Sequence, residues 1–150
     1  MQASNERAVK VLNSLIETTL DSANGYRDAA DATDNPEFKT MFAARSAKRL
    51  ELTRQLQQEV RSFGGKPEDD QSVLGKVHNK FTELKAKVTG SSDKSVIDEV
   101  ERGEDVIKAK FQKATEDEDL PPTVRQVVTT ACASIRADHD EISRLKQQLH

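Results

Sequence analysis

Polar residues interrupt the apolar stripes of the predicted helices, and their types decide what chemistry the protein could perform. They are Thr19, Arg45, Arg49, Glu104 and Asp138, spread over four long helices. Carboxylates that meet inside a helical bundle can hold a metal ion, whereas a carboxylate that meets a guanidinium group forms an ion pair. The neighbours that the fold gives to Glu104 and Asp138 therefore decide between these two kinds of site.

The helices that position these residues follow from turn signals and from the spacing of apolar side chains. The stretches TDNPEF, FGGKPEDD, TGSSDKS and DEDLPPTV contain the proline, glycine and capping residues that end one helix and begin another. Between them, apolar residues recur at 3-4 spacing, which is typical of helices that pack on neighbours. The predicted helices span residues 4–32, 36–63, 72–88, 93–116 and 122–149, with Asp34 or Asn35 as the N-cap of the second.

Composition and connection lengths predict an all-α protein with one domain over residues 1–150. Charged residues make up 33% of the chain, apolar residues 35% and aromatic residues 4%, a mixture that suits helices better than sheets. The connection between helices 36–63 and 93–116 carries a short helix and is long enough to run the length of a bundle. We expect a ferritin-like four-helix bundle with this long crossover. A plain antiparallel bundle with an excursion is the alternative.

Charge and cysteine content narrow the classes of function. Basic and acidic residues are interspersed and the net charge is −3, so we expect no nucleic-acid partner and no membrane partner. The start of the chain lacks the features of a signal peptide, and no apolar run is long enough for a transmembrane helix. The single cysteine, Cys132, is compatible with a reducing compartment. The expected location is the cytoplasm.

Three interpretations of the interrupting residues stay open. Their side chains could lie at the edges of the stripes and reach water, as long arginine side chains do. They could form a buried, mutually satisfied ion-pair layer, because two guanidinium groups and two carboxylates would balance in charge. They could belong to a metal or catalytic site. The ion-pair layer is the interpretation that the sequence favours, with Gly103, beside Glu104, allowing a neighbouring helix or an arginine side chain to approach closely.

A resemblance supports the fold more than the function. The whole chain resembles a bacterial four-helix-bundle family of unknown function within the ferritin-like superfamily. The matching stretches are LNSLIETTLDSANGYRDAA (12–30), RSFGGKPEDD (61–70), ERGEDVIKAKFQKA (101–114), LPPTVR (120–125) and HDEISRL (139–145). None of these motifs encodes a known activity, so the resemblance implies a ferritin-like bundle and no particular reaction.

The ferritin-like metal site takes a Glu from each of two helices and a Glu-x-x-His from each of the other two, and relatives carry an aromatic residue seven positions after the single Glu. The similar positions here are Glu104 with Phe111, Thr19 with Tyr26, Arg45 to Lys48, and Arg136 to His139. The resemblance thus leaves Glu104 and His139 as metal candidates, with cations where a metal needs anions. Helical phase turns Asp138 inward, whereas this comparison turns Arg136 and His139 inward, so the rotation of the last helix stays open.

The sequence therefore predicts a non-enzymatic helical bundle that acts through a protein partner or through self-association, for example as a homodimer. A buried salt-bridge layer would take the place of a di-iron site, and no cofactor is expected. The alternative is a degenerate ferritin-like metal-binding protein or oxidoreductase that uses Glu104 and His139 with iron, manganese or zinc. A small-ligand carrier that binds in the bundle core is a third hypothesis.

Overall fold

The computed structural model describes residues 2–69 and 93–149, and these ranges contain helices and no strand. The helices are α1 (Gln2–Ala32), α2 (Pro36–Ser62), α4 (Asp93–Thr115) and α5 (Pro122–Leu149). The predicted all-α four-helix bundle is therefore confirmed. The predicted short helix at 72–88 lies outside the described residues.

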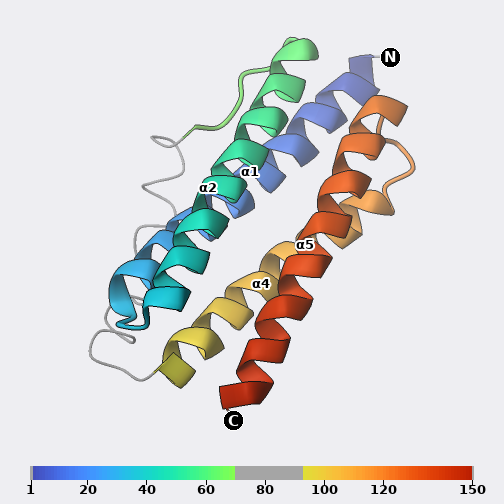
Figure 1. The fold of residues 1–150 in the computed structure, drawn as a ribbon. Helices are drawn as coiled ribbons and strands as arrows, with labels where there is room; N and C mark the ends of the chain where they lie inside the picture. The colour runs from blue at the N-terminus through green and yellow to red at the C-terminus, as the bar shows by residue number, and fades with distance from the viewer. Residues whose placement is uncertain (1, 70–92, 150) are drawn as a thin grey trace.

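The four helices form two antiparallel pairs, as Figure 1 shows. Helix α1 pairs with α2, and α4 pairs with α5, while α1 also packs on α4 and so joins the two pairs. Helices α2 and α4 run in the same direction. This parallel arrangement of α2 and α4 agrees with the bundle topology that the sequence indicated.

Local chemistry explains where α2 begins and ends. The side-chain oxygen of Asn35 accepts hydrogen bonds from the backbone N–H groups of Glu37 and Phe38, at 3.0 and 3.2 Å, and Pro36 takes the first helical position. At the other end Gly64 has a φ of 77°. Its N–H donates to the carbonyl of Arg61 and the next N–H donates to that of Val60, so the chain leaves the helix through a Schellman motif.

The buried apolar side chains form two clusters along the bundle. The large apolar cluster includes Ala8, Leu12, Leu15, Ile16, Leu20, Leu56, Val60, Ile107, Phe111, Ala114, Leu120, Val124, Val128, Ala131, Cys132 and Ile135. The small apolar cluster includes Tyr26, Ala29, Phe38, Phe42, Val96, Ile97, Val100 and Ile142. Buried polar residues lie between them in all four helices, so the core is interrupted at its middle rather than continuous.

The turn between α1 and α2 is tied to the start of α4. Thr33 is buried, and its hydroxyl donates to Oδ1 of Asp93 at 3.0 Å. The same hydroxyl accepts from the backbone N–H of Asn35, whose side chain reaches the other Asp93 oxygen at 3.4 Å. One carboxylate in the first turn of α4 therefore holds the end of the α1–α2 hairpin.

Replacing Asn35 with Ala is expected to lower the free energy of unfolding by about 1–2 kcal/mol, because the first turn of α2 loses its cap and Asp93 loses a partner. The matched control is Asp34→Ala, which removes a neighbouring exposed side chain and is expected to change stability by less than about 0.5 kcal/mol. Urea unfolding of both variants measures the difference. Equal losses would contradict the assignment of Asn35 as the cap.

The prediction that Gly103 allows close approach is wrong, because a Cβ added there would meet nothing within 4 Å. Close approach occurs at Gly65, where a Cβ would lie 2.7 Å from Cγ2 of Val9. We expect Gly103→Ala to raise the free energy of unfolding by up to about 1 kcal/mol, since Ala favours the helix. Gly65→Ala is expected to lower it. Thermal unfolding of the pair checks the opposite signs.

Candidate functional site

The candidate site is a layer of charged side chains at the middle of the bundle, between the two apolar clusters. Helix α2 contributes Arg45 and Arg49, one turn apart, while α4 contributes Glu104 and α5 contributes Asp138. Arg49 and Glu104 are each 1% exposed, and Arg45 and Asp138 are 8% and 7% exposed. Charged groups so far from water need partners, because an unpaired buried charge is strongly unfavourable.

Arg49 finds those partners on all three other helices. Its Nη1 lies 2.8 Å from Oε1 of Glu104 and donates to the hydroxyl of Ser22 at 2.7 Å. Its Nη2 donates to Oε2 of Glu104 at 3.0 Å and to Oδ2 of Asp138 at 3.1 Å. Burial acts to lower the pKa of Arg49, but its partners, Glu104 first, together raise that pKa above its ordinary value. The guanidinium therefore stays charged.

Asp138 is shared among three cations. Besides Arg49 it contacts Nζ of Lys48, 3.1 Å from each carboxylate oxygen, and Nε of Arg45, 3.7 Å from Oδ1. Arg45 also donates from Nη2 to Glu141 at 2.7 Å. Two arginines and a lysine thus face Glu104, Asp138 and Glu141, so the layer is balanced in charge.

Tyr26 covers one side of the layer. Both guanidinium carbons lie over its ring, at 5.6 Å from the centroid for Arg45 and 5.5 Å for Arg49, which is cation–π geometry. Its hydroxyl accepts a hydrogen bond from Nη1 of Arg45 at 3.3 Å. Burial, followed by the negative charge of Glu104, raises the pKa of Tyr26 well above its ordinary value. The side chain therefore stays neutral while it contacts the two cations.

The predicted site residues have different surroundings. Thr19 is fully buried, but its hydroxyl donates to the carbonyl of Leu15 in its own helix at 2.7 Å. His139 is half-buried, and its Nε2 lies 2.6 Å from Oδ1 of Asp105. Asp138 is buried and Arg136 is exposed. The rotation of α5 is therefore the one that helical phase indicated, and the rotation that the motif comparison indicated is wrong.

The layer has three further contact residues that sequence reasoning did not assign to it: Lys48, Glu141 and Ser22. Lys48 follows Arg45 by three residues, and Glu141 follows Asp138 by three. Residues three apart are neighbours on a helix surface. A search for further charged residues at this spacing from each charged stripe position would have suggested Lys48 and Glu141, each of which has the same sign as its neighbour. No comparable signal marks Ser22, because its hydroxyl is recognised only through the position of Arg49.

The residues present do not fit a metal ion. Oε1 of Glu104 is buried and accepts no hydrogen bond from the residues that the structure describes, so it is the kind of oxygen that a metal could use. The group beside it, however, is the guanidinium of Arg49, which is always protonated and cannot coordinate. Within residues 2–69 and 93–149 no group of three or more His, Cys, Asp or Glu could hold a metal.

Residues 7–117 match the family model described as Domain of unknown function (DUF2383). The chain belongs to this family. The match takes in Arg45, Arg49 and Glu104 of the DUF2383 chain and ends before α5, so Asp138 lies beyond it. A comparison with curated proteins finds no match. Among the helices that the structure describes, none is long and apolar enough to span a membrane.

Glu104→Gln in the DUF2383 chain is expected to lower the free energy of unfolding by about 3 kcal/mol, since Arg49 loses its main counter-charge while it stays buried. The matched control is Glu99→Gln on the same helix. It removes an i, i+3 pair with Arg102, whose side chain is 65% exposed, and is expected to cost less than about 1 kcal/mol. Urea unfolding gives both values, and an unchanged midpoint for Glu104→Gln would contradict a buried ion pair.

Proposed function

We propose that this protein is a non-enzymatic helical bundle that acts by associating with a protein partner or with a second copy of itself. In this proposal the arginine–carboxylate layer takes the place that a di-iron centre has in ferritin-like bundles. One observation carries it: the guanidinium of Arg49 lies between Glu104 and Asp138, at 2.8 and 3.1 Å, in the middle of the bundle.

The chemistry of the layer supports a structural role. A catalytic acid or base must reach the proton that it transfers, and a metal site needs deprotonated ligands. Here the carboxylate of Glu104 is buried against a permanent cation, and Asp138 is shared among three cations. A layer of this kind fixes how helices meet and contributes no reacting group. The function of the protein then depends on association through its surface.

The metal-binding or oxidoreductase alternative would require two existing contacts to break. Glu104 would have to leave Arg49, and His139 would have to leave Asp105, which lies 2.6 Å away. Iron, manganese or zinc would then approach a position with two guanidinium groups nearby, where like charge opposes a cation. No contact among the described residues favours this alternative over the ion-pair layer.

Metal analysis of untagged protein tests the proposal. We expect iron, manganese and zinc each at far less than one atom per chain, because Arg49 occupies the position beside Glu104. A near-stoichiometric metal that disappears in Glu104→Ala, while the variant keeps its helical circular dichroism, would contradict the proposal. The comparison variant is His139→Ala. A metal that stays bound in this variant is not held by a site made of Glu104 and His139.

Light scattering separates the two forms of the proposal. Self-association is expected to give a mass near twice the 16.7 kDa of one chain, with a dependence on protein concentration. A mass of one chain at every concentration excludes self-association and leaves a protein partner.

A further inference from the structure

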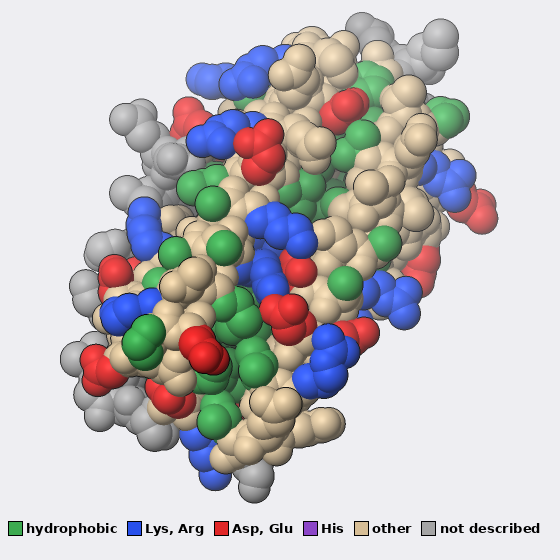
Figure 2. All heavy atoms as spheres, viewed as in Figure 1, with side chains coloured by type: hydrophobic (Ala, Val, Ile, Leu, Met, Phe, Trp, Pro, Cys, Tyr) green, Lys and Arg blue, Asp and Glu red, His purple; other side chains and the backbone are tan. Residues whose placement is uncertain are grey.

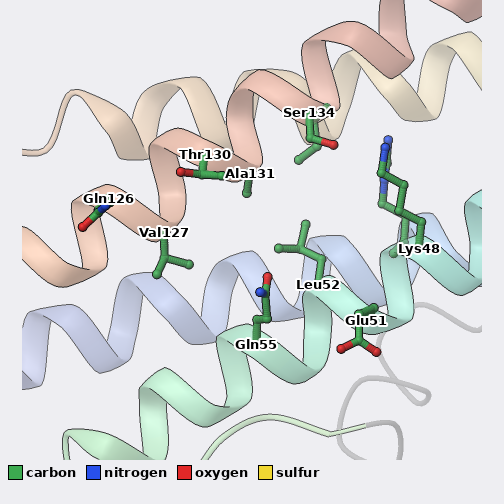
Figure 3. A pocket seen from close by; sticks show the side chains of 11 residues that line it. Lys48, Glu51, Leu52, Gln55, Gln126, Val127, Thr130, Ala131 and Ser134 are labelled. Carbon is green, nitrogen blue, oxygen red and sulfur yellow. The ribbon is translucent and has the colours of Figure 1, made fainter.

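A groove runs between α2 and α5 on the surface (Figure 3). Its volume is about 590 Å³, which lies within the range of small-ligand sites. We call it the α2–α5 groove. Its lining residues from α2 are Lys48, Arg49, Glu51, Leu52 and Gln55, and those from α5 are Gln126, Val127, Thr130, Ala131, Ser134 and Ile135.

The charges of the groove are all at one end. Lys48, Arg49 and Glu51 lie within one turn of α2, and the rest of the lining is uncharged. In Figure 3, Leu52 and Val127 point into the space between the helices, with Lys48 at the charged end. Figure 2 shows hydrophobic side chains on the floor of the hollow between these helices and Lys and Arg side chains where it approaches the middle of the molecule. The groove is therefore charged at one end, and beyond that end its apolar side chains, Leu52, Val127 and Ala131, lie among uncharged amides and hydroxyls.

We propose that the α2–α5 groove binds a medium-chain fatty acid. The carboxylate would pair with Lys48, and the alkyl chain would extend along Leu52, Ala131 and Val127. Glu51, the anion at the charged end, pairs with Arg54 at 3.2 Å. A lysine next to apolar side chains then matches a molecule that has one anionic group and an unbranched apolar tail. Away from the charged end the polar lining consists of amides and hydroxyls, so it offers no extended pattern of charges that would select a partner helix.

Lys48 is the cation that can meet such a carboxylate. Its side chain is 51% exposed, and a lysine ammonium on a flexible stem can change partners. If it turns towards a ligand, Asp138 keeps Arg49 at 3.1 Å and Arg45 at 3.7 Å. No buried carboxylate is then left unpaired. Arg49, in contrast, is fully engaged by Glu104, Asp138 and Ser22.

The size of the groove agrees with this ligand. The α5 wall runs from Gln126 to Ile135, a length of about 14 Å at 1.5 Å per helical residue. Each buried methylene of a tail gains about a fourfold increase in affinity. Affinity for fatty acids in this groove should therefore rise steadily with tail length until the apolar wall is used up.

Isothermal titration calorimetry of the full-length protein with dodecanoate, below its micellar concentration, tests the proposal. We expect one dodecanoate per chain, about fourfold weaker binding for each methylene removed from the tail, and weaker binding of dodecanol, which lacks the carboxylate. No binding of dodecanoate, or equal binding of dodecanoate and dodecanol, would overturn the proposal. These measurements need no variant and hold even if substitutions in the groove fail to fold.

Two variants locate the site. Lys48→Gln is expected to weaken dodecanoate binding at least tenfold and to leave dodecanol binding unchanged, whereas Lys113→Gln on α4, which does not line the groove, changes neither. Methyl NMR of the wild-type protein is expected to show shifts at Leu52 and Val127 on addition of dodecanoate, and none at Ile97 in the small apolar cluster. Shifts at Ile97 alone, or shifts at Leu52 that follow protein concentration rather than dodecanoate, would assign the groove to another occupant.

Discussion

The fold depends on how one buried guanidinium group is satisfied. Arg49 lies on α2, and its two terminal nitrogens contact Ser22 on α1, Glu104 on α4 and Asp138 on α5. An arginine in this position is tolerated only when every partner is present, because removing one leaves an uncompensated charge out of water. The rotation and the axial level of all four helices are therefore tied to a single side chain.

The layer and the groove share a boundary at Lys48. This side chain contacts Asp138 and also lines the α2–α5 groove, so the interior and the surface of the bundle are connected there. Glu104 is more deeply enclosed, with Arg49 beside it and Tyr26 nearby. Chemistry that needs an accessible group is therefore available at the edge of the layer and absent at its centre. The proposed role and the proposed ligand site follow from this division between a structural interior and an open side.

The sequence predicts those features that depend on local rules. Proline and asparagine at the start of α2 and glycine after it mark its ends, and helical periodicity turns Glu104 and Asp138 inward. It does not predict contacts that depend on how helices meet. Thr19 shares the buried face of α1, yet its hydroxyl bonds to Leu15 and not to the charged layer. Ser22, which contacts Arg49, carries no signal of its own. The α2–α5 groove could not be predicted from the sequence either, since the separation of two helices depends on packing and not on periodicity.

The division of the core into two apolar clusters has a consequence for motion. Among the residues that the structure describes, sixteen buried side chains belong to the large cluster and eight to the small one, so these parts of the two ends differ in hydrophobic stabilisation. Proteins open in cooperative units whose free energies follow such local packing. The end that holds the small cluster and the Thr33–Asp93 tether is therefore expected to open at the lower free energy, with the arginine layer at the boundary between the two units. The buried charges would then act as a barrier that keeps fraying at one end from reaching the other.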